Sequence, residues 1–170
     1  MTLGSVHDVY VNELANLRSF ETQLIEAIPE MAAAAHDARL ARAFSEHLAQ
    51  TERQLARLEE IIGSSPVEVP SNAGEAMRSL ISEIRRIIQT EGPGEVKDVA
   101  LIAEAQRIEH CEIATYGTAR ALADQLDLRS AVELLSETLE EEARIDELFT
   151  KLATGGLIVS GLNERAQDGA

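Results

Sequence analysis

The sequence is poor in aromatic residues, contains no tryptophan and has a single cysteine among its 170 residues. Aromatic side chains make up only 3% of the chain, so a hydrophobic core must be built mainly from leucine, isoleucine, valine and alanine. A lone cysteine excludes an internal disulfide and is typical of a protein of the reducing cytoplasm. We interpret this residue, Cys111, as structural and not as a nucleophile.

Long apolar runs are also lacking. No stretch approaches the ~20 apolar residues that a membrane span needs. No basic segment followed by an apolar run opens the sequence, so we expect no signal peptide. These observations predict a cytoplasmic protein with no membrane partner.

Basic residues are half as frequent as acidic ones, 15 against 30, which gives a formal net charge of −15. Such a surface repels phosphate backbones, so nucleic acid is excluded as an expected partner. Glycine and proline are few (10 and 4), whereas 45% of the residues are hydrophobic. Together with abundant alanine, leucine, glutamate and arginine, this composition indicates an all-α protein.

Apolar residues recur at spacings of three and four in five segments. The predicted helices cover residues 5–36, 38–62, 73–90, 95–126 and 128–153. We assign residues 1–155 to one bundle and residues 156–170 to a C-terminal tail. Two pairs of long helices joined by a long crossover predict a ferritin-like four-helix bundle. The fifth, short helix belongs to the crossover, where we expect it to cap an end of the bundle or to mediate dimer contacts.

Carboxylates interrupt the apolar stripes of the long helices where core residues are expected. These residues are Glu21, Glu109, Glu112 and Glu142. A buried carboxylate costs several kcal/mol unless a partner neutralises it, and carboxylates converging from several helices can hold a pair of metal ions. Glu142 also lies four residues before Asp146, a spacing at which both side chains can reach one ion. The alternative is that single glutamates are solvated residues at the edge of a stripe, or that Glu109 pairs with an arginine.

The second predicted helix offers amides, Gln50 and Gln54, where a symmetrical site would have charged groups. His47 borders the stripe of this helix, and we interpret it as an edge residue. His110 points sideways from its helix, which favours a role as a hydrogen-bond donor to a ligand or as a helix contact. Tyr116 lies one turn after Glu112, where it can bond to the cluster or pack in the core.

Three segments resemble the YciE/YciF family of ferritin-like stress proteins. They are Phe20–Pro29 (FETQLIEAIP), Ile108–Thr118 (IEHCEIATYGT) and Glu137–Asp146 (ETLEEEARID). The resemblance runs from about Ser5 to Ala153, and its middle motif is specific. It implies a rubrerythrin-like bundle, usually dimeric, that carries a di-metal centre. The matching ligand positions are Glu21, Gln54, Glu109, Glu112, Glu142 and Asp146.

One position departs from that family pattern: Gln50 stands where the family carries glutamate. An amide keeps an oxygen ligand but loses a charge, which weakens metal binding. We therefore expect an asymmetric site holding one or two iron or manganese ions. The side formed by the carboxylates of the last two long helices should bind more firmly than the side formed by Glu21, Gln50 and Gln54.

The functional hypothesis is a di-metal stress-response protein that reacts with dioxygen or peroxide, with no catalytic residue assigned. The alternative is a non-enzymatic, dimeric stress protein with a vestigial or single-metal site. The tail segment 156–162 loosely resembles the peptides that pack cargo into encapsulin shells. Docking of this apolar tail onto the bundle is the alternative that we favour.

Overall fold

The computed structural model describes residues 4–70, 74–155 and 161–168. Every regular element in these residues is an α-helix, so the predicted fold class is confirmed. The helices are α1 (Val6–Ala34), α2 (Ala38–Gly63), α3 (Glu75–Gln89), α4 (Gly94–Gln125), α5 (Arg129–Thr154) and α6 (Leu162–Asp168). Pro29 lies inside α1, and the helix continues through it to Ala34.

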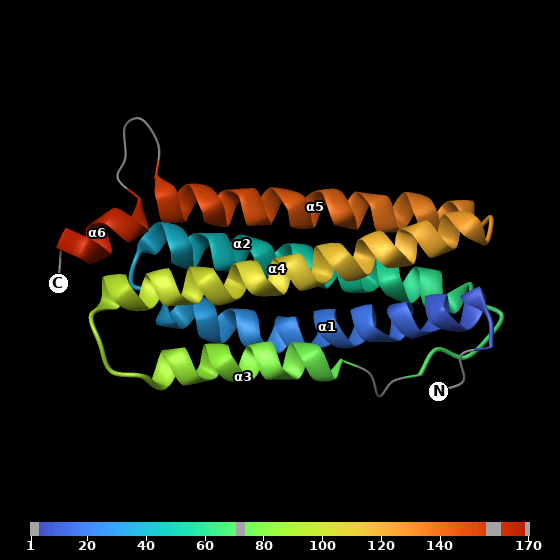
Figure 1. The fold of residues 1–170 in the computed structure, drawn as a ribbon, viewed down its shortest axis with the longest axis horizontal. Helices are drawn as coiled ribbons and strands as arrows, with labels where there is room; N and C mark the ends of the chain where they lie inside the picture. The colour runs from blue at the N-terminus through green and yellow to red at the C-terminus, as the bar shows by residue number, and fades with distance from the viewer. Residues whose placement is uncertain (1–3, 71–73, 156–160, 169–170) are drawn as a thin grey trace.

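The four long helices lie side by side as two pairs, α1 with α2 and α4 with α5, each joined by a short turn (Figure 1). The long crossover between the pairs carries α3, as in ferritin-like bundles. This short helix packs along α1 and α4 and does not cap an end of the bundle (Figure 1). The crossover therefore thickens one flank of the molecule.

The turn between α1 and α2 is held by a buried carboxylate from α4. Asp98 is fully buried, and its two oxygens accept the backbone N–H groups of His36 and Asp37, each at 2.8 Å. Both N–H groups lie outside a helical hydrogen-bond ladder, so no helix carbonyl is available to them. One side chain thus fastens the first helix pair to the second.

A layer of polar side chains divides the apolar core into two clusters. The larger cluster includes Leu24, Phe44, Leu101 and Phe149, and α3 and α6 pack beside it. The smaller cluster includes Leu14, Leu58, Tyr116 and Leu135. The buried polar residues between them are Glu21, His47, Thr51, Gln54, Glu109, Glu112, Thr138 and Glu142. Because polar groups are buried only when something satisfies them, this layer is where a functional site is expected.

The helix α6 packs against α4 and α5 at one end of the bundle (Figure 1). Leu162 is fully buried in the larger apolar cluster, and Arg165 forms an ion pair with Asp37 at the start of α2. Most of the segment that resembles an encapsulin-type peptide, residues 156–160, lies outside the described residues. None of the helices in the described part of the chain is long and apolar enough to cross a membrane.

Candidate metal centre

The register of α2 brings a histidine into the polar layer. Its buried positions include Leu40, Phe44, His47, Thr51, Gln54, Leu58 and Ile61, which alternate at spacings of four and three. The interpretation of His47 as an edge residue is therefore wrong, since its side chain is only 3% exposed. Leu48 and Leu55 are apolar, yet both lie at the half-buried margin of this face.

Four side chains from three helices converge at the centre of this layer. They are His47 of α2, Glu109 and Glu112 of α4, and Glu142 of α5, and one ligand atom from each lies within 4.8 Å of the others. Nε2 of His47 lies 3.3 Å from Oε1 of Glu109. Three carboxylates and one imidazole at such separations are a donor set that could hold a metal ion.

Glu21 of α1 faces the same cluster. It is fully buried, and the hydroxyl of Tyr116 donates a hydrogen bond to its Oε1. Burial is the main cause that raises the pKa of Glu21 to about 8, and the charge of Glu109 adds to it against the lowering effects of Tyr116 and His47. Tyr116 is also fully buried in the smaller apolar cluster, so it both packs in the core and bonds to the site.

Gln54 is oriented by a network at the edge of the layer. Its Nε2 donates to Oε2 of Glu141 at 3.2 Å, and Nη1 of Arg57 donates to the same oxygen at 2.7 Å. Burial alone would raise the pKa of Glu141, but the Arg57 guanidinium outweighs burial and holds that pKa below its usual value. The amide oxygen of Gln54 is left without a partner among the described residues, so it is available as a ligand.

Two of the predicted ligands lie outside the central group. Asp146 is partly exposed, and its Oδ1 lies 3.3 Å from Nε2 of His110 and 3.2 Å from Nε2 of Gln106. Gln50 is half-buried at the edge of the layer, near His47. The structure therefore places Glu21, Gln54, Glu109, Glu112 and Glu142 in the buried layer and the other two residues at its margin.

The donor atoms of the layer have few protein partners. The atoms that make no hydrogen bond are Oε2 of Glu21, both ring nitrogens of His47, Oε1 of Gln54, Oε2 of Glu109 and both carboxylate oxygens of Glu112 and Glu142, among the described residues. Buried polar atoms are almost always satisfied in native proteins, so this concentration at one level marks a candidate ligand site. A cation satisfies carboxylate, amide and imidazole atoms together, and the residues therefore fit a metal ion.

Electrostatics support the same interpretation. Burial first, and then the charges of Glu21 and Glu142, raise the pKa of Glu112 well above its ordinary value. Burial and the charge of Glu109 do the same for Glu142. Burial alone would lower the pKa of His47, but the neighbouring carboxylates outweigh it and raise that pKa. Without a cation the cluster must therefore keep protons, and a cation would replace them.

Sequence reasoning underrated His47 and did not find the pair formed by Arg57 and Glu141. The alternation of four and three along α2 could have identified His47, because this spacing places it directly between Phe44 and Thr51. No comparable signal marks Arg57, since its bonds reach across to another helix.

A family model described as a domain of unknown function (DUF892) matches residues 5–165. Protein YciF of Escherichia coli (strain K12) is 38% identical over 171 residues, which covers 100% of both chains. The crystal structure of the E. coli stress protein YciF is similar to this chain with a TM-score of 0.85 and 39% identity, covering 88% of this chain and 95% of that one.

Two further solved structures share the fold. YcfI of Rhodopseudomonas palustris is similar with a TM-score of 0.83 and 28% identity, covering 88% of this chain and 95% of that one. A protein of Xanthomonas campestris pv. campestris is similar with a TM-score of 0.71 over 96% of this chain and 99% of that one. Its identity is 18%, so this likeness concerns the fold alone.

Proposed function

The chain belongs to the YciE/YciF (DUF892) family of stress proteins, and on this premise we propose that its buried polar layer binds one or two iron or manganese ions and reacts with dioxygen or peroxide. The observation that carries the proposal is the set of unpaired donor atoms from four helices at one level of the bundle. Carboxylate-rich sites of this kind suit iron and manganese.

We assign the firmest site to His47, Glu109, Glu112 and Glu142, because their donor atoms lie close together. Glu21 and Gln54, each with an unpaired oxygen, would complete a second position. When bound, iron or manganese supplies one-electron redox chemistry towards an oxidant. No rubredoxin-like cysteine pair occurs in the sequence, so electrons would come from an external donor.

Residues around the proposed ligands orient them and reduce the repulsion between their charges. The Tyr116 hydroxyl holds one oxygen of Glu21 and leaves the other free. Arg57 neutralises Glu141, so this fifth carboxylate adds less repulsion to a layer that already contains four glutamates. The apolar clusters on both sides exclude water from the ligands, which strengthens their interaction with a cation.

A second candidate is a non-enzymatic stress protein with a single structural ion, acting through contacts in a homodimer. The positions of Gln50 and Asp146 favour this alternative, because both lie at the margin of the layer and leave one compact donor group. In that case the ion would join α2, α4 and α5 without exchanging electrons.

The two candidates differ in metal content and in oxidant consumption. The test is metal analysis of freshly purified protein, repeated after anaerobic loading with Fe(II) or Mn(II), followed by peroxide and dioxygen consumption by the loaded sample. Consumption that scales with bound metal supports the redox proposal. Tightly bound metal with no consumption supports the structural ion, and a failure to bind either metal rejects both candidates.

Replacing His47 with alanine is expected to weaken Mn(II) binding about 10- to 100-fold, because it removes the one nitrogen donor of the group. The measurement is calorimetric titration of metal-free protein. The matched control is His110→Ala, since His110 is exposed and its Nε2 lies 3.3 Å from Asp146 at the margin of the layer. This control should change the affinity less than about twofold. Equal effects of the two substitutions would contradict the assignment of His47 as a ligand.

A further inference from the structure

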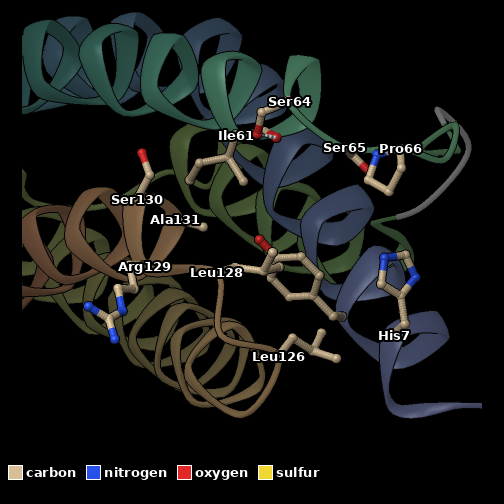
Figure 2. A pocket seen from close by; sticks show the side chains of 11 residues that line it. His7, Ile61, Ser64, Ser65, Pro66, Leu126, Leu128, Arg129, Ser130 and Ala131 are labelled. Atoms are coloured by element: carbon tan, nitrogen blue, oxygen red, sulfur yellow. Dashed lines mark hydrogen bonds between the residues drawn. The ribbon is translucent and has the colours of Figure 1, made fainter.

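A cavity of about 330 Å³ lies where α1 begins, α2 ends and the turn between α4 and α5 passes (Figure 2). Its walls are mainly apolar, with Ile61, Pro66, Leu126 and Leu128 contributing side chains. Its volume lies within the roughly 300–1,000 Å³ of small-molecule sites. None of its lining residues belongs to the polar layer, so the argument for this cavity is independent of the proposed metal centre.

The cavity is lined by a tyrosine whose hydroxyl lacks a partner. Tyr10 is only 3% exposed, and its hydroxyl makes no hydrogen bond to any described residue. Burial raises the pKa of Tyr10 to about 12, so the hydroxyl keeps its proton and remains a donor at neutral pH. A buried hydroxyl without a partner is uncommon in native proteins, and an acceptor atom of a ligand would satisfy it.

The N-terminus of α5 supplies further donors to the same cavity. Ser130 and Ala131 line it and lie in the first turn of this 26-residue helix, where N–H groups have no intrahelical acceptor. The residue at the N-cap is Leu128, and no side chain caps the helix. The dipole of the helix adds partial positive charge at this point, which favours an anion.

The charge of the lining is unlike that of the rest of the molecule. The chain has 30 acidic and 15 basic residues, yet no carboxylate of a described residue lines the cavity. Its ionisable side chains other than Tyr10 are those of Arg129 and His7. Arg129 forms no ion pair with the described residues. An anion in this cavity would thus meet no acidic side chain of a described residue in the lining.

We propose that this cavity binds a small organic carboxylate with an apolar body, such as a medium-chain fatty acid. The carboxylate would accept hydrogen bonds from the N–H groups of Ser130 and Ala131 and from the Tyr10 hydroxyl. The apolar body would lie against Ile61 and Leu128, which approach Ala131 around the cavity (Figure 2). Burial of such a body supplies affinity, and the donors supply selectivity for the charged end.

The first experiment compares octanoate with 1-octanol by calorimetric titration of the full chain as purified. The two probes have the same apolar body, so their difference measures recognition of the carboxylate. Octanoate should bind at least about tenfold more tightly, because charge-assisted hydrogen bonds are the stronger ones. Equal affinities, or no binding of octanoate at millimolar concentration, would overturn the proposal.

Two substitutions locate the site. Tyr10→Phe removes only the hydroxyl and should weaken octanoate binding about fivefold, the usual effect of deleting one hydrogen bond. Leu128→Asp places a carboxylate at the N-cap, where it takes over the free N–H groups and repels an anion, so octanoate binding should be lost. The melting temperature of Leu128→Asp should be unchanged or higher, which separates loss of the site from loss of the fold.

Two readouts keep the test specific. Metal content should be unchanged in both variants, since the cavity and the polar layer share no residue. Light scattering reports whether a second copy of the chain covers the cavity. A change of oligomeric state in Leu128→Asp without octanoate would identify the surface as a subunit interface and overturn the proposal.

Discussion

Replacing Asp98 with alanine is expected to lower the free energy of unfolding by about 3 kcal/mol, because it leaves two backbone N–H groups without their charged acceptor. The carboxylate is fully buried and accepts both N–H groups at 2.8 Å. For a chain of this length the melting temperature should fall by about 6–12 °C.

Urea and thermal unfolding measure this effect. The matched control is Asp124→Ala, which removes an exposed aspartate from the same helix and should change stability by less than about 0.5 kcal/mol. Asp98→Asn keeps one oxygen acceptor and should lie between the two. A stability of Asp98→Ala close to that of the control would show that the two hydrogen bonds do not hold the turn.

Replacing Glu112 with glutamine is expected to stabilise the metal-free protein at pH 8 by about 1–3 kcal/mol, since an amide of the same shape removes a buried acidic group from a crowded layer. Both oxygens of Glu112 lack partners, and its neighbours are other carboxylates. The same change should abolish most of the stabilisation that Mn(II) gives to the native protein. We therefore expect Glu112→Gln to make the metal-free protein more stable and to weaken its binding of Mn(II).

The sign of the pH dependence follows from the raised pKa values. Glu21 has a folded pKa of about 8, above the roughly 4.3 of an unfolded glutamate, and Glu112 and Glu142 shift in the same direction. The contribution of these groups to stability is fully present below the unfolded pKa. It is lost as pH rises through the folded pKa, because the unfolded chain then holds fewer protons than the folded one. The metal-free protein should therefore lose stability between about pH 5 and 8, and Glu112→Gln should lose less.

Unfolding at pH 5.5 and 8, with a chelator and with Mn(II), tests this prediction. Glu140→Gln is the matched control, because it changes an exposed glutamate of α5 that pairs with Arg144. It should leave both the pH dependence and the metal effect unchanged. A Glu112→Gln variant that is less stable than the native chain at pH 8 without metal would count against a carboxylate cluster under electrostatic strain.

The fold class follows directly from the sequence, because apolar stripes at helical spacing determine which face of each helix is buried. The stripe of α2 shows the limit of that reasoning. Its apolar residues favour a face that includes Leu48 and Leu55, but the buried face is turned towards His47 and Gln54. The side chains of the neighbouring helices determine which face of α2 is buried, and the sequence of α2 alone does not reveal them.

The candidate site was predictable where a glutamate interrupts an apolar stripe, as for Glu21 and Glu142. Asp146 shows why helical spacing is not sufficient. It lies four residues after Glu142, yet its carboxylate reaches Gln106 and His110 on α4 and remains partly exposed. Glu142 and Asp146 lie on the same face of α5, and the way α4 and α5 cross decides which of the two carboxylates is buried. The bonds of Arg57 to Glu141 depend on packing between helices in the same way.

The polar layer bears on the cooperativity of unfolding. It separates two apolar clusters, so the two ends of the bundle share little hydrophobic contact and are joined mainly by the helix backbones and the buried donors. A cation bound to α2, α4 and α5 would couple the ends into one unfolding unit. Without a cation, the two ends can unfold locally at different rates. One end is the part packed against α3 and α6, and the other is the part that contains the cavity.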